Sequence, residues 1–209
     1  MKPETKKDDG VAPVVGVMLM IVVTVIIAAV VAGFATGFIS GNTGAPNAFF
    51  DVRLNANAGN TGDQYVMTIE HLGGQTVNTS ELEIKTDYTY TGFKAGSTAG
   101  KELINRVQKS SSVTSSSQLT KLSDGTQVRF PYLADVSIGA PGASEVNFGN
   151  FDFKSGQMMT TGTSKGTEAV LGFDVTKSEN GFGPGSVVNV RIIHKPSGVS
   201  LFDKEVRVA

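Results

Sequence analysis

Two histidines, His71 and His194, are the only imidazole groups that could serve as bases or metal ligands in this 209-residue chain. They lie far apart in the sequence, and each ends an alternating, strand-like segment. We therefore expect each at the surface or at the rim of a barrel rather than in a metal site. The carboxylates are scattered singly, so they suggest no acid–base pair. No serine–histidine–acid combination carries the glycine pattern of a nucleophile elbow.

Residues 96–102, GSTAGKE, faintly resemble a phosphate-binding loop. Only three residues separate its glycines, and Glu102 stands where such a loop needs Ser or Thr, so we interpret the segment as a flexible loop. Cysteine is absent, which excludes disulfides, thiolate metal sites and cysteine nucleophiles. The sequence therefore predicts no catalytic residue, cofactor or metal, and no enzyme. The formal net charge of −1 gives no support for nucleic-acid binding.

The strongest feature is an apolar segment near the N-terminus. Residues 11–39 contain no charged residue, and Thr24 and Thr36 are their only clearly polar side chains. As a helix, residues 14–39 would be roughly 39 Å long at about 1.5 Å per residue, whereas a bilayer core needs about 20 residues. A cleaved secretory signal has a shorter apolar core, so the segment is too long for one. A plain signal anchor fits its length.

Charge predicts the orientation of this segment. Lys2, Lys6 and Lys7 precede it, and residues 40–50 after it carry no Lys or Arg. Because positive charge is retained in the cytoplasm, we expect the C-terminal part of the chain outside the cell.

Small residues recur every fourth position in the second half of the segment, at Ala29, Gly33, Gly37 and Gly41. They would share one helix face, where small side chains let helix backbones approach closely. Such a stripe also arises by chance in membrane helices, and Gly37 and Gly41 could instead end the helix.

The rest of the chain predicts an all-β head, so the fold class is α+β: a long hydrophobic helix followed by a sandwich or barrel. Period-two alternation begins at Phe50 and returns in short segments. We expect these segments at residues 50–54, 65–69, 82–88, 127–133, 145–153, 168–175, 187–194 and 199–208. In residues 92–126 the alternation is lost, and we expect a long loop over a sparse strand pair there. Asn78, in the turn before residue 82, begins the only N-x-[ST] sequon and is a candidate for N-glycosylation.

The string at residues 10–20, GVAPVVGVMLM, resembles the opening of archaeal type IV pilins. The resemblance is strong over residues 8–40 and implies a class III signal peptide, cut by a prepilin peptidase between Gly10 and Val11. Residues 1–10 would be the leader, 11–41 the membrane anchor and later filament core, 42–48 a linker, and 49–209 the extracellular β domain. Val15 stands where bacterial pilins carry a conserved glutamate, so the pairing of that carboxylate with a neighbour's N-terminus has no counterpart here.

This resemblance implies a structural subunit of a cell-surface filament that polymerises through its helix, with adhesion as the usual role. It further implies insertion in the membrane before assembly. The implied partners are copies of the chain itself, a prepilin peptidase, an assembly ATPase and a membrane platform protein. The alternative is a monomeric, signal-anchored binding module with a β-sandwich head. A secreted hydrolase would need a role for His71 or His194 that the sequence does not suggest.

Overall fold

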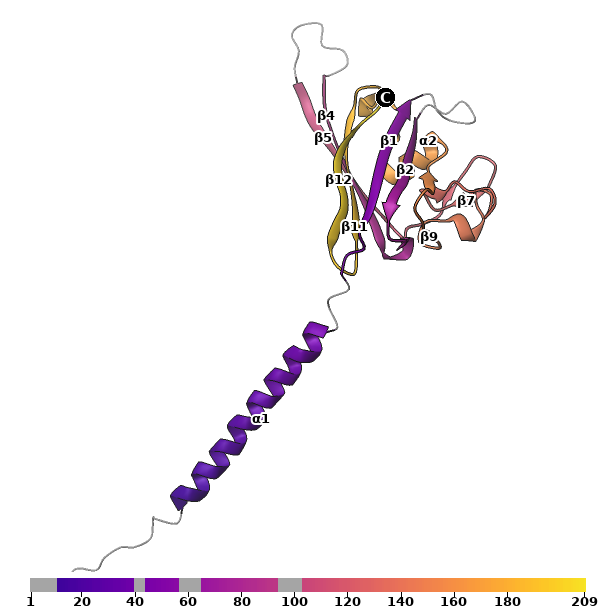
Figure 1. The fold of residues 1–209 in the computed structure, drawn as a ribbon. Helices are drawn as coiled ribbons and strands as arrows, with labels where there is room; N and C mark the ends of the chain where they lie inside the picture. Colours follow the sequence, from indigo (N-terminus) through magenta and orange to yellow (C-terminus); the bar gives the residue numbers. More distant parts are fainter. Residues whose placement is uncertain (1–10, 40–43, 57–64, 94–102) are drawn as a thin grey trace, which may run out of the picture. The chain divides into compact units, whose positions relative to one another are not determined.

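The computed structural model describes residues 11–39, 44–56, 65–93 and 103–209. The chain divides into two compact units, residues 1–43 and residues 44–209. The first unit contains one helix, α1, which runs from Val11 to Ile39 (Figure 1). The second unit is the strand-rich head. The expected fold class, an apolar helix followed by a β head, is confirmed.

The head is built on two four-stranded sheets, both antiparallel throughout. The first has the order β1-β2-β10-β8 and the second β12-β11-β4-β5. Two further sheets are two-stranded, β3-β9 and β6-β7. The strand bounds are β1 Ala48–Ala56, β2 Tyr65–Gly74, β3 Val77–Asn78, β4 Leu82–Phe93, β5 Leu103–Thr114, β6 Thr120–Lys121, β7 Gln127–Val128, β8 Tyr132–Leu133, β9 Asp152–Phe153, β10 Met158–Thr160, β11 Val187–His194 and β12 Val199–Arg207.

Several of these strands lie where the alternation places them. In β1 the burial of side chains alternates from Ala48 to Leu54, and in β11 it alternates along the whole strand. The expected hairpin of β11 and β12 is present, with pairing from Val187↔Arg207 to His194↔Val199. Alternation of this kind is what a strand shows when one face meets the core and the other meets water.

The expected strand at residues 168–175 is wrong, because Ser164–Leu171 forms a helix, α2. Thr163 caps its first turn by accepting a hydrogen bond from the Gly166 N–H at 3.0 Å. Gly172 ends it in the left-handed conformation, at φ +78°, which glycine adopts without strain. These caps outweigh the β propensity of the short apolar run between them.

Three other segments also differ from expectation. The expected strand at 145–153 is a 3-10 turn, Ser144–Val146, followed by β9, and the expected strand at 127–133 is divided into β7 and β8 by a bend at Pro131. Within 92–126, the structure has the 12-residue strand β5. Its Ser-rich sequence does not show the apolar alternation of a strand. Serines 110 and 112 lie on the outer face beside β4, where they donate hydrogen bonds to Asp87 and Glu83, both at 2.6 Å.

One continuous core lies between the sheets. It takes apolar side chains from both four-stranded sheets, from α2 and from the connecting segments. Met67, Ile69 and Ile192 are fully buried, as are Phe148 and Phe153. Because the chain has no cysteine, this packing and the strand hydrogen bonds supply the stability that small secreted domains often obtain from disulfides.

We expect Phe153→Ala to destabilise the head strongly. Phe153 is fully buried and stacks on Phe50, with ring centroids 5.9 Å apart. Truncating such a ring leaves a cavity and lowers the free energy of unfolding by about 3–5 kcal/mol. Denaturant unfolding of the full chain in detergent, followed by the β-sheet circular dichroism signal, measures this. Leu72→Ala is the control, since Leu72 is exposed and its loss should cost less than about 0.5 kcal/mol. Equal effects of the two changes would contradict the proposed core.

Candidate functional site

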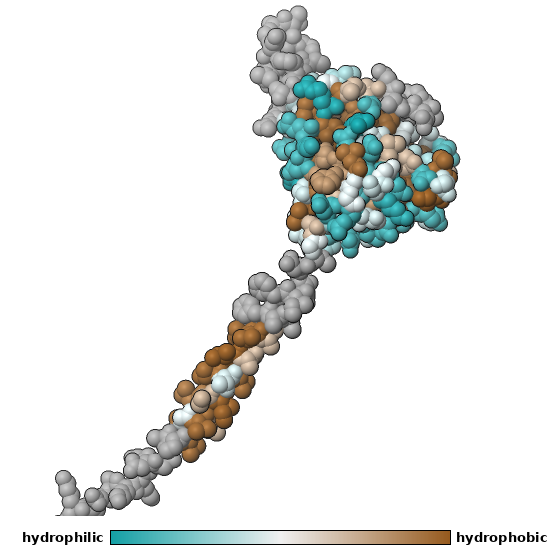
Figure 2. All heavy atoms as spheres, viewed as in Figure 1, coloured by the Kyte–Doolittle hydropathy of each residue, from teal (hydrophilic) through white to brown (hydrophobic). Residues whose placement is uncertain are grey.

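The functional feature with the clearest physical signature is α1. Its large apolar side chains from Val14 to Val31 are each 43–70% exposed, so nothing in the described part of the chain covers them. Figure 2 shows apolar residues along the coloured length of the helix, whereas the visible face of the head mixes hydrophilic and apolar residues. Thr24 satisfies its hydroxyl within the helix by donating to the Ile21 carbonyl at 2.8 Å. Residues Val14–Ala32 have the length and composition of a membrane span.

The described part of α1 begins directly after the expected leader junction. Val11 is the first helical residue, and Pro13 lies in the first turn, where its missing N–H costs no hydrogen bond. Gly10 lies outside the described residues. Whether the bond between Gly10 and Val11 is cut remains a prediction from the sequence.

The small-residue stripe lies only partly within the described residues. Ala29 is exposed, and Gly33 and Gly37 belong to the same helix, at a spacing that puts all three on one face. Gly41 lies outside the described residues. The role of this stripe as a packing surface stays a prediction.

Asn78, the sequon residue, is exposed at the surface of the head. It ends β3 and caps the 3-10 turn Thr79–Glu81, because its Oδ1 accepts a hydrogen bond from the Ser80 N–H at 2.8 Å. Its Nδ2 donates one hydrogen to Asp152 at 2.9 Å. The second hydrogen on Nδ2 has no partner among the described residues, so this nitrogen can carry a substituent without losing either contact.

The histidines do not lie where we expected them. Both were expected at the surface or a barrel rim, yet His71 is fully buried and His194 nearly so. The His71 ring packs against both Phe50 and Phe153, with centroids 5.0 and 5.3 Å away. Its Nδ1 and Nε2 lie 3.1 and 3.0 Å from the carbonyl oxygens of Phe153 and Gly73. The imidazole therefore links β2 to β9 and is part of the core.

His194 belongs to a contact that the sequence did not reveal. Its Nδ1 lies 2.8 Å from Ser197 Oγ, and its Nε2 lies 3.4 Å from Glu81 Oε2. Serine, histidine and glutamate in this order resemble a hydrolytic triad. Here, however, they fasten the β11–β12 turn to Glu81, the residue before β4. The Lys195 N–H donates to the Glu81 carbonyl at 2.8 Å, and within the turn the Gly198 N–H donates to the His194 carbonyl at 2.8 Å. The proximity of Ser197, His194 and Glu81 therefore follows from the way this turn is held against the chain before β4.

Among the described residues, no group of three His, Asp or Glu side chains is arranged to hold a metal ion. The phosphate-loop-like segment at 96–102 lies wholly outside those residues. The geometry thus provides an apolar helix with the length of a membrane span and a separate β head. Residues 9–50 match the family model described as archaeal type IV pilin, N-terminal.

This match confirms the resemblance that the apolar string suggested, and the N-terminal segment is similar to that of archaeal type IV pilins. Pilins of this family are structural proteins rather than known enzymes. Comparison with curated proteins gave no match, and neither did comparison with solved structures. The match ends at residue 50, shortly after β1 begins, so the fold of the head is described from its own residues.

Proposed function

We propose that this chain is the subunit of a type IV pilus-like surface filament, that it polymerises through α1, and that the filament serves adhesion. The observation that supports this most directly is the exposure of the large apolar side chains from Val14 to Val31 of α1, in a chain whose N-terminal segment matches the pilin family. A helix that is apolar on every side needs burial on every side. Lipid provides that burial before assembly, and the helices of neighbouring copies provide it afterwards.

The energetics favour a one-way transfer from membrane to filament. Fourteen large apolar side chains are exposed on α1. At about 1.5–3 kcal/mol each, their exposure to water would cost a few tens of kcal/mol, so an assembled filament does not dissolve into monomers. Moving the same helix from lipid to a bundle of helices is much closer to neutral, because lipid is itself apolar. An assembly ATPase and a membrane platform protein, as the family implies, would drive that transfer.

The leader and the orientation complete the proposal. A prepilin peptidase would remove residues 1–10, whose lysines hold this end of the chain in the cytoplasm, and the head would lie outside the cell. N-glycosylation of Asn78 fits this location, since the residue is exposed and its Nδ2 has a hydrogen to spare.

Processing of the leader is tested by N-terminal sequencing of surface material. We expect the mature chain to begin at Val11, and Gly10→Val to leave the chain unprocessed in the membrane because a bulky residue replaces the glycine before the cut. Val14→Ile, beyond the junction, is the control and should be processed normally. A mature chain that begins at Met1 would overturn the proposal.

The role of the small-residue face is tested at Gly33. A leucine there would hold neighbouring backbones apart, so we expect Gly33→Leu to abolish filaments in electron micrographs while the protein still reaches the membrane. Gly33→Ala keeps the residue small and should retain filaments. A signal-anchored monomer would show no filaments in the unaltered protein and no difference between these two variants.

Glycosylation is tested by the intact mass of the surface protein. We expect a mass above that of the bare chain, and we expect Asn78→Gln to remove the excess. Ser80→Thr keeps the sequon and should keep the glycan. An unmodified mass in the unaltered protein would exclude occupancy at Asn78.

A further inference from the structure

The large apolar side chains that the head leaves in water gather at one of its ends. The antiparallel pairing of β1 with β2, of β2 with β10 and of β10 with β8 puts the starts of β1 and β10 and the ends of β2 and β8 at the same end of the first sheet (Figure 1). Because the chain passes from α1 into β1, the head begins here, and we call this the entry end.

Three of these side chains lie on the outer face of the first sheet. Phe49, Leu72 and Met158 are each 40–59% exposed, whereas a residue beside each of them in its strand is buried. Phe49 pairs with Gly73, the residue after Leu72. Met158 pairs with Glu70, two residues before Leu72. The three exposed side chains are therefore cross-strand or diagonal neighbours on one face.

Two more exposed side chains, Val136 and Ile138, lie in the turn that follows β8, and Val136 is 96% exposed. The Ala134 N–H donates to the Met158 carbonyl at 2.8 Å, so this turn begins beside β10. Single exposed apolar residues are normal on a protein surface, but five at the end of one sheet form a patch. We call this set the entry patch: Phe49, Leu72, Val136, Ile138 and Met158.

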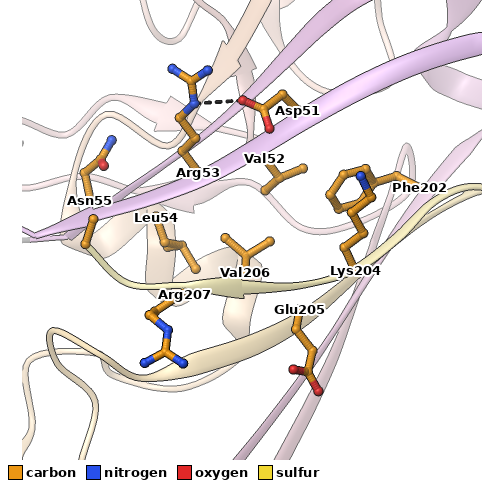
Figure 3. Close-up of a pocket in the computed structure, with 11 residues that line it drawn as sticks. Asp51, Val52, Arg53, Leu54, Asn55, Phe202, Lys204, Glu205, Val206 and Arg207 are labelled. Carbon is orange, nitrogen blue, oxygen red and sulfur yellow. Dashed lines mark hydrogen bonds and ion pairs between the residues drawn. The ribbon is translucent and has the colours of Figure 1, made fainter.

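The second sheet adds an apolar residue at the same end. Strand β12 meets β1 in parallel at the bridge Leu54↔Val208, beside the shallow pocket that the two strands line (Figure 3). Parallel strands start at the same end, so Val199, the exposed first residue of β12, also lies at the entry end. Among the head side chains that the structure describes, seven large apolar ones are exposed, and the one outside this group is Leu119.

The charges at the entry end are mixed. Lys195, in the β11–β12 turn, and Lys154, shortly before β10, are exposed there. Glu81, directly before β4, is exposed as well. Asp135 lies within the turn after β8, and hydrogen bonds from Ser137 hold the pKa of its carboxyl group below the usual range. The entry patch is therefore distinguished by its apolar side chains and not by a net charge.

The bilayer is the apolar surface nearest to the entry patch along the chain. Helix α1 contains the candidate span Val14–Ala32 and ends at Ile39, and only residues 40–47 separate it from Ala48, where β1 begins. Fully extended, that stretch reaches about 30 Å at most, however the two units are arranged. Exposed phenylalanine and aliphatic side chains are stabilised at the boundary between lipid headgroups and acyl chains.

We propose that the entry patch docks the head on the headgroup region of the membrane that α1 spans, before the subunit enters a filament. Phe49, Leu72 and Val136 enter the apolar side of that boundary, and the mixed charges around them make the contact independent of anionic lipid. The inference rests on the membrane insertion in the proposed function and deepens it. Extraction of α1 then also lifts the entry patch from lipid.

An environment-sensitive label tests the docking. The chain has no cysteine, so Leu72→Cys gives a single thiol for the fluorophore NBD. For the full chain, reconstituted at high dilution in phosphatidylcholine vesicles, we expect the emission to shift to shorter wavelength and to be quenched by lipids with a shallow nitroxide. Ser112→Cys is the control, because Ser112 is exposed two residues before the end of β5 but on the outer face of the second sheet, so its label should report water. A label at position 72 that also reports water would overturn the inference.

Removal of the apolar side chains tests the entry patch itself. With the label on Val136→Cys, we expect Phe49→Ser combined with Leu72→Ser to return the emission to that of water and to abolish the quenching. Leu119→Ser, which changes an exposed apolar residue outside the patch, should leave the signal unchanged. Circular dichroism checks that both backgrounds keep the folded head. Equal signals in the two backgrounds would contradict a contact made by the patch.

The docking and the filament fail separately. A chain that does not float with the vesicles has not inserted α1, which would contradict both proposals. If the label at position 72 reports water in vesicles and an apolar environment only in filaments, the patch meets a second copy, so the docking is wrong and the filament stands. A wavelength shift that requires phosphatidylserine would also refute the docking, because charge would then carry the contact.

Discussion

The structure depends on one constraint: α1 is apolar on every side and has no cover within the described chain. Such a helix is not stable in water, because exposing its side chains costs far more free energy than the total folding stability of an ordinary domain. The helix must therefore lie in lipid or among other helices. The leader, the orientation and the filament in our proposal are successive ways of meeting that single requirement.

The head meets the opposite requirement. Its core takes side chains from both sheets and from α2, and its buried hydroxyls are satisfied internally, as where Thr167 donates to the Tyr65 carbonyl at 2.9 Å. It needs no residue of α1 for its core and no disulfide. A head that is complete in this sense can stay folded while the helix moves from one apolar environment to another.

Local patterns predicted those elements whose environment is simple. Residues 11–39 are uniformly apolar because the whole helix is suited to an apolar environment. Strands β1 and β11 alternate because one face of each meets the core and the other meets water. The helix α2 was missed because Ala169, Val170 and Leu171 fit either a strand or a short helix, and the caps Thr163 and Gly172 decide between them. His71 was misplaced because burial of a polar ring depends on the carbonyl groups of distant residues, here Phe153. Strand β5 was missed because its serines pair with acids across the sheet.

The sequence by itself therefore determined the apolar helix and its likeness to the N-terminal segment of archaeal type IV pilins. Length, charge and the string around Gly10 are local properties, so they can be read without the fold. Only the tertiary structure decided what the surfaces of the head offer. The first and last strands of the head, β1 and β12, meet next to one bridge and line a shallow pocket there. No local pattern encodes that meeting, since Leu54 and Val208 are brought together by the packing of both sheets.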